Sequence, residues 1–280
     1  MTAALALPES SLPGSEAAWL VTTGLLSLRI ASTFLMTPIF YVPALPGSVR
    51  SLMLLSIAVA MAAGMQPSAV AFGSPGALLL AALSELALGA TLGLGILLAF
   101  GAISVAGQLL DVQLGFGMAQ VLDPATRRPT PILTTAFNYV AVLVFFTLNG
   151  HHALLRGLRL SVDRFAVGMF WSLPLASSAV LKQAGGLFTL GFALAAPVVF
   201  CILLVEFVLG VIGRNLPQMN MFAIGIPVKV VVGLVALSMW FTGMGGAMTR
   251  IYAGITTTWE QIFTDATPAA GSGTATGQGR

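Results

Sequence analysis

The amino-acid sequence predicts an all-α, polytopic membrane protein. Of its 280 residues, 57% are hydrophobic and only 8% are charged, against roughly 25% charged in ordinary soluble domains. The mean hydropathy is +0.97, so a soluble fold of this length would lack the polar groups to cover its core. In lipid the backbone must pair its own polar groups in helices or closed barrels, and the long unbroken apolar runs favour helices. Membrane lipid is therefore the expected solvent.

About six apolar runs are candidate helices, taking roughly 20 residues per membrane crossing. The first run contains Arg29, the second is short for a full crossing, and the third contains Glu85. The fifth contains Lys182 and Glu206, and the sixth has Lys229 near its start. In order, the runs are residues 17–40, 52–65, 76–110, 132–148, 177–212 and 221–248.

The third and fifth runs are too long for one straight crossing. They predict either bent helix pairs or helices that project beyond the hydrocarbon. Pro197 and the neighbours Gly185 and Gly186 are candidate break points in the fifth run. In the third run, Gly89 and Gly93 have the spacing that allows helices to approach closely, although glycine is common in membrane helices in general.

The chain reads as one membrane domain, residues 1–264, followed by a tail. Residues 265–280 are small, polar and rich in glycine, which predicts disorder. The arginines are scattered singly, so there is no basic patch of the kind that binds nucleic acid.

Five charged residues lie within or at the edge of the apolar runs. Each costs roughly 2.5–3.5 kcal/mol at a helix centre in a bilayer, so each needs water or a partner. They can reach the interface from helix ends, pair with one another or with partner subunits, or form an ion or proton relay. The five are Arg29, Glu85, Lys182, Glu206 and Lys229.

The sequence contains no catalytic constellation, so we expect a protein that is not an enzyme and that binds no metal or cofactor. His151 and His152 are adjacent, and adjacent side chains on a helix point about 100° apart, which makes a poor metal site. We expect these imidazoles to lie at the headgroup boundary or to hydrogen-bond to the backbone. Hydrolase, phosphate-loop and zinc-protease motifs are missing from the sequence.

Residues 115–128 interrupt the apolar pattern with glycines, a methionine, an Asp-Pro turn and two arginines. This segment is either a solvated turn between two membrane helices or a mobile segment at a place where something passes. The glycines free the backbone, and the phenylalanine and methionine offer soft apolar filling. The residues that give the segment this character are Gly115, Phe116, Gly117, Met118, Asp123 and Pro124.

A second interruption, residues 214–220, predicts a break between two helices. Pro217 stops a helix, and Gln218 and Asn220 can bond the backbone groups that are freed. Glu206 and Lys229 flank this break, and we expect them to pair across the resulting hairpin.

Three stretches together resemble the FliR family of flagellar type III export-gate proteins, whose relatives in virulence injectisomes are called SctT. They are residues 115–161, 205–234 and, more weakly, 29–50, in the same order and spacing as in that family. The most specific pieces are Arg-Asn-Leu-Pro-Gln-Met-Asn at 214–220 and Asn-Gly-His-His at 149–152. The likeness covers nearly the whole chain apart from its two ends.

The resemblance implies a structural, channel-forming subunit of the export gate in the bacterial inner membrane, at the flagellar basal body. FliR-like proteins assemble with FliP and FliQ, stand near FlhB and FlhA, and pass unfolded flagellar substrates through a central channel. Their helices form hairpins within that larger helical assembly. By the same resemblance, residues 115–128 are a plug in the channel, and the turn with Arg214, Pro217, Gln218 and Asn220 faces neighbouring subunits.

Two alternatives remain from the sequence. One is the SctT-type counterpart in an injectisome. The other is a secondary transporter with broken helices, coupled through Glu85 or Glu206. Transporters often carry two similar halves, and no matching half-repeat is visible here.

Overall fold

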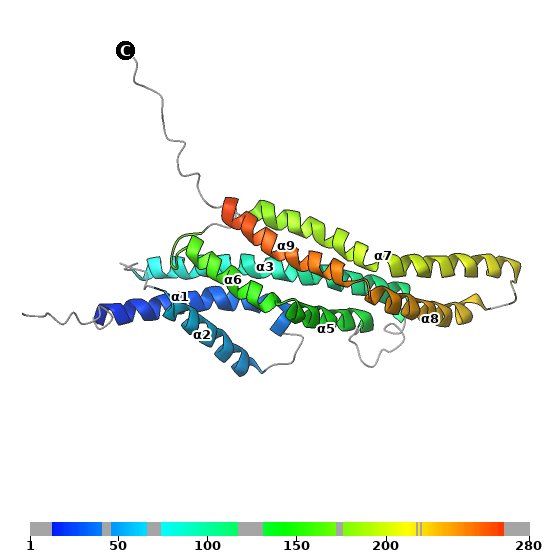
Figure 1. The fold of residues 1–280 in the computed structure, drawn as a ribbon, viewed down its shortest axis with the longest axis horizontal. Helices are drawn as coiled ribbons and strands as arrows, with labels where there is room; N and C mark the ends of the chain where they lie inside the picture. Colours follow the sequence, from blue (N-terminus) through cyan, green and yellow to red (C-terminus); the bar gives the residue numbers. More distant parts are fainter. Residues whose placement is uncertain are drawn as a thin grey trace, which may run out of the picture.

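A computed structural model of the chain describes residues 13–40, 46–65, 74–116, 131–171, 176–216, 218 and 220–265. The regular structure in these ranges is helical, which confirms the all-α prediction. The helices form an elongated bundle (Figure 1). They are α1 (Pro13–Leu35), the short 3-10 helix η2 (Pro38–Phe40), α2 (Gly47–Ala63), α3 (Pro75–Gln113), α5 (Ile132–Thr147), α6 (Gly150–Arg164), α7 (Ser177–Asn215), α8 (Met221–Phe241) and α9 (Gly245–Asp265).

Several described helices are long and apolar enough to cross a membrane. Four qualify by length and composition, namely Glu16–Leu35 of α1, α3, α7 and Ala223–Phe241 of α8. The helices α5 and α6, bent by 70° at the break between them, form a fifth span if the pair is counted as one. The helix α2 has 17 residues, in agreement with the short second run. The chain is thus a polytopic membrane protein.

The two overlong runs are single helices rather than pairs. Both α3 and α7 have 39 residues. At about 1.5 Å per residue each is about 58 Å long, well beyond a hydrocarbon layer of about 30 Å. Gly185, Gly186 and Pro197 lie inside α7 and do not divide it. The helix nevertheless changes direction near its middle (Figure 1), as expected where a proline removes a backbone hydrogen bond.

The boundary predicted for the sixth run is wrong. The run 221–248 contains the end of α8 at Phe241 and the start of α9 at Gly245. The helix α9 continues to Asp265, at the expected end of the domain. The rest of the expected tail, residues 266–280, lies outside the described residues.

The helix α3 is the centre of the bundle and packs against α1, α5, α7 and α9. Its glycines allow this. A Cβ atom at Gly89 would lie 2.0 Å from Ser32 Oγ and 2.2 Å from the Arg29 carbonyl oxygen, and one at Gly93 would lie 2.6 Å from the Thr33 carbonyl oxygen. The spacing of Gly89 and Gly93 therefore marks the close contact between α1 and α3, as one of the two interpretations predicts.

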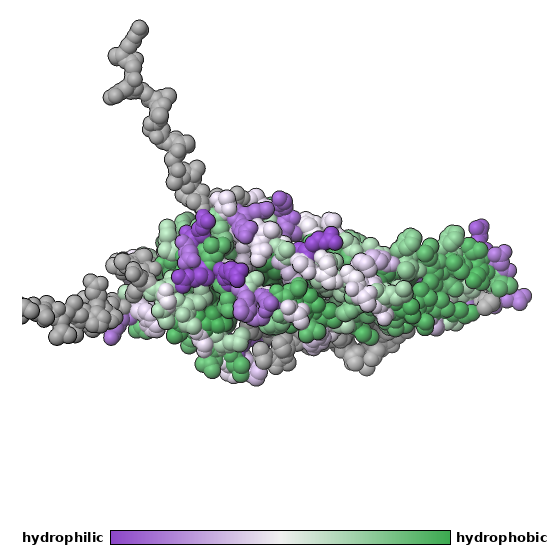
Figure 2. Space-filling view, viewed as in Figure 1, coloured by the Kyte–Doolittle hydropathy of each residue, from purple (hydrophilic) through white to green (hydrophobic). Residues whose placement is uncertain are grey.

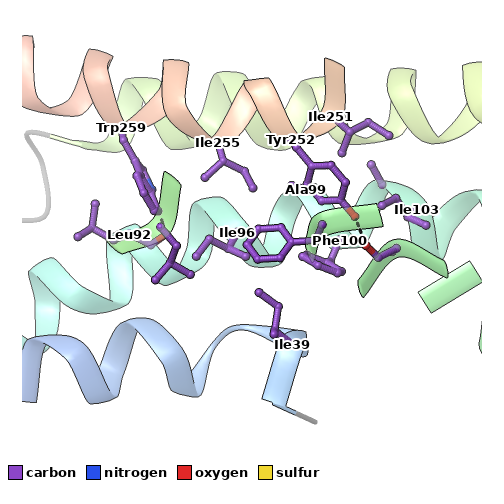
Figure 3. Packing of buried hydrophobic residues seen from close by; sticks show 14 of the residues in the cluster. Ile39, Leu92, Ile96, Ala99, Phe100, Ile103, Ile251, Tyr252, Ile255 and Trp259 are labelled. Carbon is purple, nitrogen blue, oxygen red and sulfur yellow. Dashed lines mark hydrogen bonds between the residues drawn. The ribbon is translucent and has the colours of Figure 1, made fainter. Parts of the chain in front are cut away.

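Aromatic side chains fix α9 to this centre. Trp259 Nε1 donates a hydrogen bond to the Leu92 carbonyl oxygen at 3.1 Å, and the Tyr252 hydroxyl donates to that of Ala141 at 2.6 Å. Figure 3 shows both side chains pointing from α9 toward Leu92 and Phe100 of α3. Burial raises the pKa of the Tyr252 hydroxyl, which keeps it a hydrogen-bond donor.

The helices α7 and α8 are strongly apolar and yet little covered by the rest of the chain. The most hydrophobic window of α7 has 22% of its residues buried and that of α8 has 11%, whereas the α3 window has 61%. Figure 2 shows an almost continuous hydrophobic surface at the end of the molecule formed by α7 and α8. Hydrophilic side chains gather instead over α6 and the neighbouring part of α9. In the isolated chain, the hydrophobic surface of α7 and α8 is therefore exposed.

Replacing Gly89 by alanine tests the contact between α1 and α3. The new methyl group meets backbone oxygen, which cannot move aside as a side chain can, so we expect a loss of about 1–3 kcal/mol from overpacking. The matched control is Gly24→Ala in α1, where nothing lies within 4 Å of the new atom. Thermal unfolding of the purified protein in detergent measures both, and equal melting temperatures for the two variants would contradict the contact.

Candidate functional site

Arg29 and Glu85 form an ion pair at the junction of α1 and α3. Arg29 Nε lies 2.5 Å from Glu85 Oε2, and Arg29 Nη2 donates to Oε1 at 2.9 Å. Each side chain is 1% exposed. Two N–H groups of the guanidinium thus donate to the two oxygens of the carboxylate, and such bidentate pairs are among the strong charge-assisted hydrogen bonds.

The pair also holds the chain that follows α6. Arg29 Nη1 donates to Ser161 Oγ at 3.3 Å and Nη2 to the Phe165 carbonyl oxygen at 3.1 Å. The backbone N–H of Gly168 donates to Glu85 Oε1 at 2.8 Å. Both charges are therefore paired and hydrogen-bonded inside one chain, which is the condition under which buried charges are tolerated. Of the three interpretations of these charges, the structure shows pairing within the chain for Arg29 and Glu85.

Ser84, the neighbour of Glu85, extends the same junction. Its hydroxyl donates to the Met169 carbonyl oxygen at 2.8 Å and accepts from the backbone N–H of Trp171 at 2.7 Å. Together, Ser84 and Glu85 dock residues 168–171 onto α3. Sequence reasoning did not single out Ser84, because a serine in an apolar helix gives no signal of its partners.

Glu206 and Lys229 are joined across the hairpin of α7 and α8, as expected, by a hydrogen-bonded ion pair. Their side chains are 37% and 26% exposed, respectively. The pair borders a groove of about 420 Å³ whose lining includes Gly210, Gly213 and Gly225. By contrast, Lys182 is exposed and forms no ion pair within the described residues. The five intramembrane charges thus do not form one cluster.

The turn between α7 and α8 is a helix break, as its sequence predicts. The helix α7 ends at Asn215, and Asn220 Oδ1 accepts a hydrogen bond from the backbone N–H of Ala223 in the first turn of α8. Arg214, Gln218 and Asn220 are exposed. Pro217 lies outside the described residues.

The candidate plug segment is described only where it begins. At Gly115 the backbone has φ +82°, a conformation that favours glycine, and Phe116 is partly buried against the core. The preceding Leu114 is fully buried and lies against the position a Cβ atom would take on Gly233 of α8. Gly117, Met118, Asp123 and Pro124 lie outside the described residues.

Asp111 is a site residue that sequence reasoning missed. It is 3% exposed near the end of α3, and its two carboxylate oxygens accept from the backbone N–H groups of Leu133 and Thr134, both at 2.9 Å. Thr134 Oγ1 adds a third bond at 2.7 Å. The carboxylate therefore caps the N-terminus of α5 and fastens it to α3. The sequence signal that could have indicated this role is a single aspartate directly after the apolar run 76–110.

The Asn-Gly-His-His stretch forms the sharp bend between α5 and α6. Asn149 has φ 56°, and a Cβ atom at Gly150 would lie 2.4 Å from the ring of Phe145, so both residue types fit the bend. The rings of His151 and His152 have centroids 4.3 Å apart. The buried Nδ1 of His151 has no hydrogen-bond partner among the described residues, so the structure shows no backbone bond at this atom, and the other expectation, a place at the headgroup boundary, stays a prediction. The described residues also contain no group of three potential metal ligands.

Removing one charge of the Arg29–Glu85 pair tests whether the pair acts as a unit. Arg29→Met leaves a buried carboxylate without its partner, for which we expect a loss of roughly 3–5 kcal/mol and a lower melting temperature in detergent. Adding Glu85→Gln removes the second charge, while the amide oxygen can still accept from Gly168, and we expect most of the stability to return. Lys182→Met is the control for losing an exposed charge. A double variant no more stable than the single one would contradict the prediction.

Comparisons with known proteins identify a family and several relatives. The model of the family described as "Bacterial export proteins, family 1" matches residues 20–255. The flagellar biosynthetic protein FliR of Escherichia coli (strain K12) is 32% identical over 210 residues, which cover 74% of this chain and 79% of that protein. The FliR protein of Bacillus subtilis (strain 168) is 32% identical over 163 residues, 57% of this chain and 62% of its own length.

A virulence-related protein is similar as well. The surface presentation of antigens protein SpaR of Shigella flexneri is 30% identical over 145 residues, 52% of this chain and 56% of that protein. The family match spans most of the chain, from α1 into α9. The alignment with the Escherichia coli relative covers 74% of the chain. This chain therefore belongs to the bacterial export proteins, family 1, the FliR family that its sequence resembles.

Proposed function

We propose that the chain is a structural, channel-forming subunit of the flagellar type III export gate, assembled with FliP and FliQ in the bacterial inner membrane at the flagellar basal body. The observation that carries the proposal is the open surface of α7 and α8. These helices are highly apolar, yet only 22% and 11% of their hydrophobic windows are buried. Exposed apolar surface of this extent marks a site of contact with lipid or with other subunits.

The α7–α8 hairpin has the features of a subunit contact. Glycines at 210, 213 and 225 border its groove, which allows another helix to approach closely. The partly exposed pair of Glu206 and Lys229 would be costly in contact with lipid, so in this proposal it lies against polar groups of another subunit. At the end of the hairpin, Arg214, Pro217, Gln218 and Asn220 face neighbouring subunits, with FlhB and FlhA nearby.

Residues 115–128 form the plug of the channel in this proposal. Their anchoring supports the assignment. Asp111 fastens the end of α3 to the start of α5, so the two helices that flank the segment are held together. Apolar side chains such as Phe116 and Met118 make many weak contacts, which a passing unfolded flagellar substrate can displace. The role is non-enzymatic and needs no cofactor.

A second candidate is the injectisome counterpart of SctT type. It is favoured by the 30% identity to SpaR of Shigella flexneri over 145 residues. The same subunit architecture serves both, and the difference lies in the exported substrates. The transporter alternative has less support, because Arg29 and Glu85 are enclosed and paired with each other.

Co-purification tests the proposal. The tagged chain, expressed with FliP and FliQ, is expected to be recovered with both in one large particle, whereas a transporter would run alone or as a dimer. Glu206→Lys places two like charges together in the hairpin and is expected to reduce the recovery of FliP and FliQ. The double variant Glu206→Lys with Lys229→Glu restores opposite charges and should restore recovery. Unaltered recovery with Glu206→Lys, or a double variant as poor as the single, would contradict this role for the hairpin.

The plug makes a separate prediction on the same particle. Replacing residues 117–124 by a glycine-serine stretch of equal length keeps Leu114 and Phe116 in the core and removes the apolar filling. We expect the particle to assemble normally and to conduct small ions in a planar bilayer, because the pore is no longer sealed. The control is Tyr139→Ser, on the exposed face of α5. A change within residues 102–104 would not serve, because α3 is buried there. Equal conductance in all three proteins would rule out the plug.

A further inference from the structure

A half-open pocket lies between α9 and the bend that joins α5 to α6. Its volume is about 250 Å³, and its lining includes Ile96 of α3, Phe145 of α5 and Trp259 of α9. Figure 3 shows Ile255 and Trp259 extending from α9 toward the side of the bundle formed by α3. The pocket is thus set into the core of the chain and is not a shallow mark on one helix.

The side chains that line the pocket leave no donor for an occupant. The Tyr252 hydroxyl and Trp259 Nε1 already donate to backbone oxygens of α5 and α3. The hydroxyls of Thr249 and Thr256 donate to carbonyl oxygens of their own helix, both at 2.9 Å. Apolar cavities stay dry, and one of about 150 Å³ holds a benzene-sized molecule. The lining therefore suits a larger apolar group rather than water.

The end of the pocket formed by α5 has apolar neighbours. Leu148 lines the pocket and is 45% exposed. On the preceding turns of α5, Leu143 and Phe146 are exposed as well. An apolar occupant can therefore extend from the pocket along this side without meeting a charged group.

The opposite end carries two charges. On α6, Arg156 lies one turn beyond Ala153, which lines the pocket. On α9, Glu260 lies one turn beyond Thr256, which also lines it. The two helices run in the same direction (Figure 1), so both charges lie beyond the same end of the pocket. Both side chains are exposed, and neither forms an ion pair within the described residues.

We propose that this pocket binds one zwitterionic phospholipid with a phosphoethanolamine headgroup. Part of an acyl chain lies between α9 and the α5–α6 bend, the phosphate lies at Arg156 and the amine lies at Glu260. An apolar pocket with a cation and an anion beyond one end has the same polarity as such a lipid. A partner helix, about 10 Å across, is too wide for the pocket. The inference goes beyond the proposed function, because it requires only that the chain lies in a membrane.

Brominated acyl chains, which quench tryptophan emission on contact, test the pocket through Trp259. The purified full-length chain in detergent is titrated with phosphatidylethanolamine brominated in one acyl chain. We expect saturable quenching, with an affinity that Ala253→Leu in the pocket lining lowers several-fold. The matched control is Ala136→Leu, because Ala136 is also exposed but does not line the pocket. Quenching that does not saturate, or that is the same in both variants, would overturn the inference.

A change of headgroup tests the two charges. Phosphatidylglycerol with the same brominated chain keeps the phosphate but has no amine, and we expect it to bind several-fold more weakly. Arg156→Gln is expected to weaken the binding of phosphatidylethanolamine several-fold, whereas Arg250→Gln, at an exposed arginine outside the pocket lining, is the control. Glu260→Gln is expected to remove the preference between the two lipids. Equal affinity of the unaltered chain for both lipids, or an Arg156 variant equal to its control, would contradict the assignment.

The assembled particle distinguishes a lipid from a neighbouring subunit. The same titration is made on the particle recovered with FliP and FliQ, and we expect saturable quenching that Ala253→Leu again weakens. Quenching in the isolated chain but not in the particle would show that a subunit fills the pocket and would overturn the inference. Failure to recover FliP and FliQ would contradict the proposed function instead, and the titration of the chain alone would still decide whether the lipid binds.

Discussion

The ion pair of Arg29 and Glu85 is the constraint on which the rest of this fold depends. Two opposite charges, each 1% exposed, meet where α1, α3, the end of α6 and residues 165–168 come together. Neither charge can be left alone in such surroundings, because an unpartnered buried charge costs several kcal/mol. Segments that lie 56 and more than 130 residues apart in the sequence must therefore reach one place in one register. The glycines of α3 let α1 come close enough for this to happen.

Many buried polar groups of the chain bond to other groups of the same chain, while much of the apolar surface of α7 and α8 stays exposed. Asp111 caps α5, Ser84 and Glu85 hold residues 168–171, and Tyr252, Trp259 and Trp240 donate to backbone oxygens of other helices. The exposed helices α7 and α8 carry apolar side chains instead. Hydrogen bonds and ion pairs thus fix how the helices of the single chain pack. The exposed apolar surface is left to contact lipid or other proteins. Under the proposed function, this division suits a subunit that folds first and assembles afterwards.

Hydropathy predicts most of the helices, because a long apolar run in lipid has few other structures open to it. The pairing of Glu206 and Lys229 was also predictable, since the two residues lie at similar distances from the turn of one hairpin. Arg29 and Glu85 could not be matched in this way, because their contact depends on how distant helices pack. The helix α9 was missed for a different reason. Its mean hydropathy is modest, and only the recurrence of Met248, Ile251, Ile255, Trp259 and Ile262 at helical spacing reveals its buried face. The break predicted at Pro197 is only a bend, because α7 changes direction near this residue but continues as one helix.

The two contrasting surfaces of the chain constrain how it can be placed in an assembly. The α7–α8 surface is stabilised by lipid or apolar neighbours, whereas the hydrophilic surface over α6 and α9 is stabilised by water (Figure 2). In a simple bundle that crosses a bilayer, water lies beyond the helix ends and lipid lies along the sides. Here the hydrophilic surface runs along the side of a helix, since the exposed residues of α9 extend from Gly245 to Thr264. Water must then reach the side of the bundle, which requires either a water-filled interior shared by several subunits or a position outside the hydrocarbon. Both arrangements depend on neighbours, so a self-sufficient carrier buried in lipid on all sides is the one arrangement that this surface disfavours.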